Sequence, residues 1–344
     1  MGPDIRRFAQ RAGGRPDRPV EVCHAAPRRA SDHCLLFRLA TLCSLAATVI
    51  APAAAEPFIG QFELKTLESE PGEYEFQSQN AWSWGQPPRR IQPVEDGFEL
   101  DDNAVVRRRH ALELEIGLTR FLKTRVGIEF EQERLDEPAS LADIDAFDSL
   151  KLAEVGAELI GILVPREGDG AGFGVVVEIE GPVDGDEPNH FVFGPIVEYQ
   201  SGRWFLSAIP MLVHAFGGEA DDDGRSDDKW DFAYATQLRY AFSPRWALAL
   251  EAYGTVERLG NSGHRSDAAR LFGDSNQHRA GPVLYYRYTF DRAGPVRTAM
   301  RPGALTYQDE EEEGTRLTIG LGWLQGLTDH TPDHTLKFSL EVQF

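Results

Sequence analysis

The feature that most restricts what this chain can fold into is a strict alternation of apolar and polar residues. It is clearest over residues 335–344, TLKFSLEVQF, where Leu336 and every second residue up to Phe344 are apolar and the residues between them are polar. Successive side chains of a β-strand point to opposite faces, so this segment predicts a strand with one apolar and one polar face.

The same alternation recurs along most of the chain and predicts antiparallel strands joined by turns. The predicted strands cover residues 73–84, 105–118, 124–134, 147–164, 172–181, 189–200, 203–215, 229–242, 245–258, 277–290, 315–325 and 335–344. Short turns, such as those at 201–202 and 243–244, alternate with longer acidic loops. This alternation, with an even number of amphipathic strands, is typical of outer-membrane barrels. The sequence therefore predicts an all-β fold, an antiparallel transmembrane β-barrel of about twelve strands.

One segment leaves the strand count open. Residues 291–314 are long, yet they fall at the end where the other turns are short. They form either an extended turn or a further hairpin, in which case the barrel has about fourteen strands. Residues 85–104, which hold several prolines and charges, are expected to form a loop.

Residues 1–55 carry the features of an export signal. An apolar run at 34–50 leads into Ala53, Ala54 and Ala55, the small residues of a cleavage site. We expect residues 1–55 to be a signal peptide with an extended N-terminal region, removed after Ala55. An N-terminal membrane anchor is the alternative interpretation. The mature chain then has a periplasmic N-terminal segment at 56–72 and an outer-membrane barrel at 73–344.

Charge and cysteine content exclude several functions. Asp and Glu number 55 against 35 Lys and Arg, an excess that argues against a nucleic-acid partner. The cysteines, Cys23, Cys34 and Cys43, all precede the expected cleavage site. The mature chain would therefore hold no disulfide and no cysteine-based metal site, and no cofactor is expected.

The final strand also predicts where the protein resides. An amphipathic strand that ends on Phe344 resembles the closing strand of bacterial outer-membrane β-barrels, which their assembly machinery recognises. The resemblance implies that the mature protein lies in the outer membrane of a Gram-negative bacterium. The expected partners are this assembly machinery, outer-membrane lipids and lipopolysaccharide, and a small solute.

Loose motifs extend the resemblance to one family. They are the opening ELKTLESEPGEYEFQ, the short turns SGRW and SPRW, and the closing GLTDHTPDHTLKFSLEVQF. Over residues 60–344 the chain resembles the outer-membrane proteins named for the meta-pathway of phenol degradation. The resemblance implies a barrel that moves small, often hydrophobic compounds across the outer membrane. The chain departs from the family by its acidity, which argues against an aromatic substrate, and no site residue is carried over.

Glutamates are expected to line the barrel interior, because they occupy the polar face of the predicted strands. Together with the few basic residues of the same orientation, the lumen-lining candidates are Glu113, Glu115, Glu129, Glu131, Glu154, Glu158, Glu178, Glu180, Glu198, Arg239, Glu251, Arg287 and Glu341. Rings of glutamate favour cations, so the sequence predicts a channel for a small solute with a preference for cations. The alternative interpretation is a structural network that braces the wall.

No catalytic or metal site is expected. The Asp-His pairs at 329–330 and 333–334 offer metal donors, but Pro332 prevents the helix that would align them. No Gly-x-Ser-x-Gly motif occurs, which argues against a lipid-modifying enzyme. We therefore expect a non-enzymatic channel, with an outer-membrane lipid-modifying enzyme or a structural barrel with a closed lumen as the alternatives.

Overall fold

The computed structural model describes residues 64–89, 91–94, 97–100, 105–135, 138, 140–166, 168–183, 188–217, 228–257, 259, 276–291 and 314–344. These residues form one closed barrel and a two-stranded sheet. The expected signal peptide and its cleavage site after Ala55 lie outside the described residues. Within the described part of the chain, no helix is long and apolar enough to cross a membrane.

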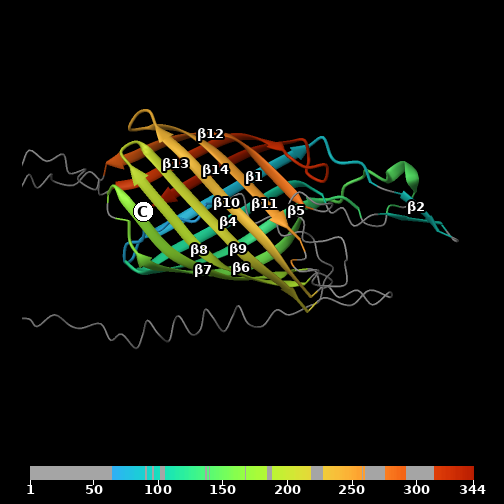
Figure 1. Cartoon of the computed structure of the whole chain (residues 1–344), viewed down its shortest axis with the longest axis horizontal. Coiled ribbons are helices and arrows are strands. Elements are labelled where there is room, and N and C mark those ends of the chain that lie inside the picture. The colour runs from blue at the N-terminus through green and yellow to red at the C-terminus, as the bar shows by residue number, and fades with distance from the viewer. Residues whose placement is uncertain are drawn as a thin grey trace, which may run out of the picture. The chain divides into compact units, whose positions relative to one another are not determined.

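The barrel wall consists of twelve antiparallel strands (Figure 1). They are β1 (Tyr74–Trp84), β4 (Val106–Thr119), β5 (Leu122–Glu133), β6 (Lys151–Val164), β7 (Gly170–Pro182), β8 (Asn189–Ser201), β9 (Trp204–Phe216), β10 (Lys229–Ala241), β11 (Trp246–Val256), β12 (Gln277–Asp291), β13 (Gly314–Gly326) and β14 (His334–Gln343). β1 pairs with β4 on one side and with β14 on the other, which closes the wall. The prediction of an all-β, twelve-stranded antiparallel barrel is confirmed.

The fourteen-strand alternative is wrong. β12 pairs directly with β13, from Arg279 opposite Gly326 to Asp291 opposite Gly314. No further strand therefore separates these two in the wall, although residues 292–313 lie outside the described residues.

The expected loop at 85–104 contains a hairpin that the sequence interpretation missed. β2 (Ile91–Val94) pairs with β3 (Gly97–Leu100) in a sheet of their own. Each strand has only four residues, too few for alternation to stand out. The connection between β5 and β6 holds the single-turn helix η1 (Leu141–Asp143).

The connections define two ends of the barrel. Short turns join β4 to β5, β6 to β7, β8 to β9 and β10 to β11 at what we call the short-turn end. The chain terminus lies there too, because the backbone of Phe344 exchanges hydrogen bonds of 2.9 and 3.0 Å with Tyr74 at the start of β1. β1 ends and β4 begins at the opposite end, which we call the long-loop end, and the described residues between β5 and β6 lie there too.

The outward face of the wall is apolar. Leu250, for example, is 58 % exposed in the middle of β11. Aromatic pairs lie near the strand ends, Trp204 with Tyr240 towards the short-turn end and Trp84 with Trp323 towards the long-loop end. An exposed apolar band between two aromatic girdles is what a membrane barrel presents to lipid.

Candidate functional site in the barrel interior

The barrel interior collects most of the glutamates that were predicted to line a lumen. Nine are buried on the face opposite to the exposed leucines: Glu113, Glu115, Glu129, Glu131, Glu158, Glu178, Glu180, Glu198 and Glu251. Glu154, Arg239 and Glu341 are half-buried, and Arg287 is exposed. Whether these side chains line a conducting path stays a prediction.

Ion pairs across β4, β5 and β6 hold several of these glutamates. Arg125 donates to Glu115 at 2.9 Å and lies 3.6 Å from Glu113 and 3.8 Å from Glu158. Lys123 adds a second cation 2.8 Å from Glu115. The wall therefore carries a buried network in which one guanidinium serves carboxylates from two neighbouring strands.

Inward basic residues are more numerous than expected, which corrects the sequence interpretation. Arg109 pairs with both Glu129 and Glu131. It lies in a run of three arginines, and the apolar–polar alternation does not show which of the three faces inward. Lys123 fell within a predicted turn. Arg125 was detectable, because it has the same parity in its strand as Glu129 and Glu131. Much of the glutamate charge is thus balanced inside the wall.

The chain ahead of β1 lies inside the barrel at the short-turn end. The ammonium of Lys65 contacts Glu158 and lies 3.1 Å from Glu178, and the backbone N–H of Leu67 donates to Glu198 at 2.9 Å. We call residues 64–70 the interior segment. They belong to the stretch expected to be a periplasmic segment, 56–72, and Lys65 and Leu67 are buried against the wall.

Glycines in β7 make room for the interior segment. A Cβ at Gly174 would lie 2.5 Å from Leu67 Cδ2, and one at Gly172 would lie 3.0 Å from Leu67 Cδ1. At Gly117 a Cβ would lie 2.0 Å from the carbonyl oxygen of Glu70. A side chain at Gly117 would require the backbone of the segment to move, whereas one at Gly172 or Gly174 would require the side chain of Leu67 to move.

Glu68 brings a carboxylate into a group of arginines at the short-turn end. It lies 2.6 Å from Arg166 and 3.9 Å from Arg316. The Glu68 side chain is 53 % exposed, and its partial desolvation inside the barrel would raise its pKa. The charges of Arg166, Arg287, Arg316 and Arg239 outweigh this effect and lower the pKa. The interior is therefore rich in arginine at this end, whereas the sequence predicted an acidic lumen with few basic residues, of which Arg239 and Arg287 belong to this group.

A second buried network surrounds Glu251 on β11. Its carboxylate accepts hydrogen bonds from Tyr253 at 2.6 Å, Tyr285 at 2.5 Å and Gln237 at 2.7 Å. Lys337 on β14 completes the group at 2.8 Å. Both charged side chains are almost fully buried, so each compensates the other where water is excluded.

Part of the interior is apolar, which the sequence interpretation did not anticipate. The buried cluster includes Ile160, Ile162, Val176, Val192, Ile196, Ile209, Met211, Val213, Ala233, Ala235, Ala249, Val283 and Leu324. β8 and β9 read as nearly continuous apolar runs, and that pattern is the signal that both of their faces are apolar. The interior thus has a charged side and an apolar side.

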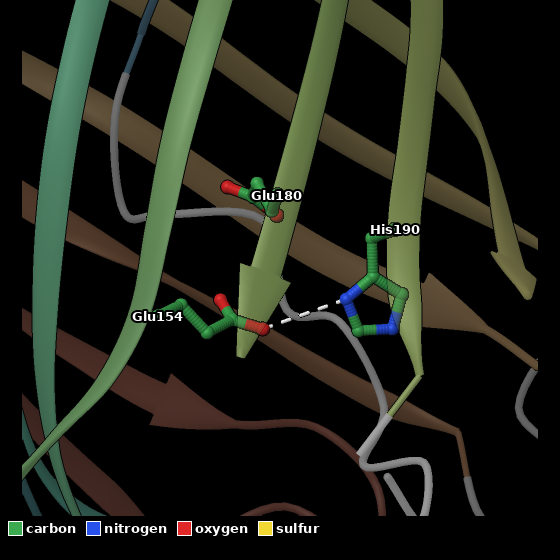
Figure 2. Close-up of side chains that lie close together, drawn as sticks. All are labelled: Glu154, Glu180 and His190. Carbon is green, nitrogen blue, oxygen red and sulfur yellow. Dashed lines mark ion pairs between the residues drawn. The ribbon is translucent and has the colours of Figure 1, made fainter. Parts of the chain in front are cut away.

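One group of side chains has donor atoms arranged as a metal site would require. Glu154, Glu180 and His190 each place a donor atom within 4.8 Å of the others (Figure 2). The sequence interpretation expected no metal site and did not single out His190, because only the pairing of three strands brings these residues together.

Comparison with known proteins supports the fold. The chain resembles an outer-membrane channel from Pseudomonas putida F1, a COG4313 protein, with a TM-score of 0.51 and 11% identity over 84% of this chain and 98% of that one. More distant structures include the NanC porin, at a TM-score of 0.44 and 8% identity over 78% of this chain and 98% of that one. No family model and no curated protein matches the sequence.

Proposed function

We propose that the protein is an outer-membrane channel of a Gram-negative bacterium through which a small solute passes. The observation that carries this proposal is the inverted distribution of side chains. Leucines cover the outside of the wall, and the charged side chains gather within it. Such a wall is stable only where lipid surrounds it. Its polar interior then offers a polar solute a route across the membrane that the hydrocarbon of the lipid cannot provide.

The interior is suited to a solute with both an apolar and a polar part. The inward apolar side chains of β8 and β9 and the ion pairs on β4 and β5 are buried. A solute that displaced what covers them would contact hydrocarbon on one side and hydrogen-bond partners on the other. This agrees with the small, often hydrophobic compounds that the family resemblance implies.

We expect a modest preference for cations. Towards the long-loop end Glu154 and Glu180 add negative charge beside Arg109, which already serves Glu129 and Glu131. Rings of carboxylates favour cations, but the arginines around Glu68 act against this at the short-turn end. The preference should therefore weaken as salt screens the field.

The interior segment restricts the path. Lys65 is anchored to Glu178 on β7, and the backbone N–H of Leu67 is anchored to Glu198 on β8. Because both glutamates lie on the inward face of the wall, the segment occupies space at the short-turn end that a solute would need. We expect small conductance in the unmodified protein, and larger conductance when the segment is displaced.

Planar-bilayer recordings on the refolded protein test the channel and the role of the segment together. Leu67→Asp places a carboxylate beside Glu198, which should expel the segment and raise the single-channel conductance. Ser69→Ala is the matched control, since its hydroxyl only donates to the carbonyl of Thr119 at an exposed position. No conductance in either variant would favour the structural barrel, and turnover of lipid A or phospholipid would favour the enzyme.

The remaining partners are proposals as well. The apolar exterior would contact outer-membrane lipids and lipopolysaccharide, and β14 with Phe344 would be recognised by the barrel assembly machinery. Truncation of Phe344 should then slow assembly in cells more than it affects the refolded barrel.

A further inference from the structure

We propose that Glu154, Glu180 and His190 form a binding site for a divalent transition-metal ion, with zinc as the best fit. The residues lie on the adjacent strands β6, β7 and β8, near the long-loop end (Figure 2). One carboxylate oxygen from each glutamate and one imidazole nitrogen lie within 4.8 Å of one another. His190 Nδ1 is 3.5 Å from Glu154 Oε1.

Strand register and one glycine bring these donors together. Glu180 lies directly opposite His190 on β8 and opposite Gly156 on β6. A Cβ at Gly156 would lie 3.2 Å from Glu180 Cγ and 3.8 Å from its Oε1. Because residue 156 has no side chain, the side chain of Glu180 lies close to the backbone of β6, the strand that carries Glu154.

The donor set matches zinc better than magnesium or calcium. Zinc binds imidazole nitrogen and carboxylate oxygen at roughly 2.0–2.2 Å in a tetrahedron, so neighbouring donors lie about 3.4 Å apart. The distance of 3.5 Å between His190 and Glu154 already meets this requirement. Magnesium and calcium prefer six or more oxygen ligands, whereas water can supply the fourth ligand of zinc.

The surrounding charge also favours a dication. Glu129 lies directly opposite Glu154 across β5 and β6, and Glu178 precedes Glu180 by two residues on the same face of β7. Carboxylates this close repel one another, and a bound dication offsets that repulsion. Arg109 forms an ion pair with Glu129, and Lys65 forms one with Glu178. The carboxylates that flank the proposed ligands are therefore already paired with cations.

Zinc titration of the refolded protein in detergent, followed by calorimetry and by metal content after dialysis, tests the site. We expect one zinc ion per chain, and an affinity lower by at least about tenfold in Glu180→Gln and in His190→Ala. Cobalt in place of zinc should give a visible absorption spectrum of four-coordinate cobalt, which the same variants abolish.

His214→Ala is the matched control. His214 lies on the next strand, β9, and stacks on Trp230 with ring centroids 4.4 Å apart, on the outward face. The His214→Ala variant should bind zinc as the unmodified protein does. Circular dichroism establishes that each variant has folded, and His190→Gln replaces His190→Ala if the latter does not fold.

Two results would overturn the site. One is the absence of zinc binding by the unmodified protein, and the other is binding that Glu180→Gln and the His190 variant leave unchanged. The titration measures equilibrium binding without any conductance, so its failure would leave the channel proposal standing.

Discussion

Removing the charge of Glu251 should destabilise the barrel strongly, although the substitution barely changes the shape of the side chain. Glu251→Gln leaves the ammonium of Lys337 buried without its carboxylate, and Lys337 is only 2 % exposed. Breaking a buried ion pair by removing one partner costs about 3–5 kcal/mol. The amide oxygen of Gln can still accept the hydrogen bond of Tyr253 or that of Tyr285, so we expect a cost near the lower end of this range.

A double-mutant cycle isolates the pair. Lys337→Met alone should also be costly, since it leaves the Glu251 carboxylate buried without its ammonium, whereas Glu251→Gln with Lys337→Met removes both charges. The double variant should therefore lose about 3 kcal/mol less than the sum of the single variants. Urea unfolding of the barrel in lipid vesicles, followed by tryptophan fluorescence, measures all four proteins. Additivity within about 0.5 kcal/mol would refute the reasoning.

Three further outcomes follow from the same structure. Leu248→Arg on the lipid-facing side of β11 should cost about 2–4 kcal/mol, whereas Leu248→Val should cost far less; equal costs would contradict the assigned outer face. Because the pKa of Glu68 is lowered, its ion pairs stabilise the interior segment fully at pH values above the ordinary pKa of a glutamate. This stabilisation is lost as the pH falls through the lowered pKa. Hydrogen exchange of the segment should therefore rise in acid in the native protein, while Glu68→Gln should show raised exchange that changes little with pH. N-terminal sequencing of exported protein should begin at Glu56, and a start well before residue 50 would exclude the signal peptide.

Strand positions were predictable because alternation is a local property. Each predicted strand of the wall overlaps an observed one, and the direct pairing of β1 with β14 follows from the amphipathic terminal segment. The β2–β3 hairpin was not predictable in this way, since it is short and lies in a segment rich in proline and charge.

The interior was harder to predict, because alternation tells which face a residue occupies and not what it meets across the lumen. The partnership of Glu251 with Lys337 joins strands that are not neighbours in the wall, and Lys65 reaches Glu158 from a segment outside the strands. The convergence of Glu154, Glu180 and His190 likewise depends on register, which no single strand encodes.

Thiol labelling tests most directly the central claim, which is that one face of each strand meets lipid and the other faces the barrel interior. Expressed from residue 56, the chain has no cysteine, so single cysteines can be placed on β12. In vesicles, Arg287→Cys on the inward face should react with a membrane-impermeant maleimide, and Leu284→Cys on the outward face should react only after detergent is added. Equal reaction of both cysteines in vesicles, or reaction of Leu284→Cys alone, would contradict the account.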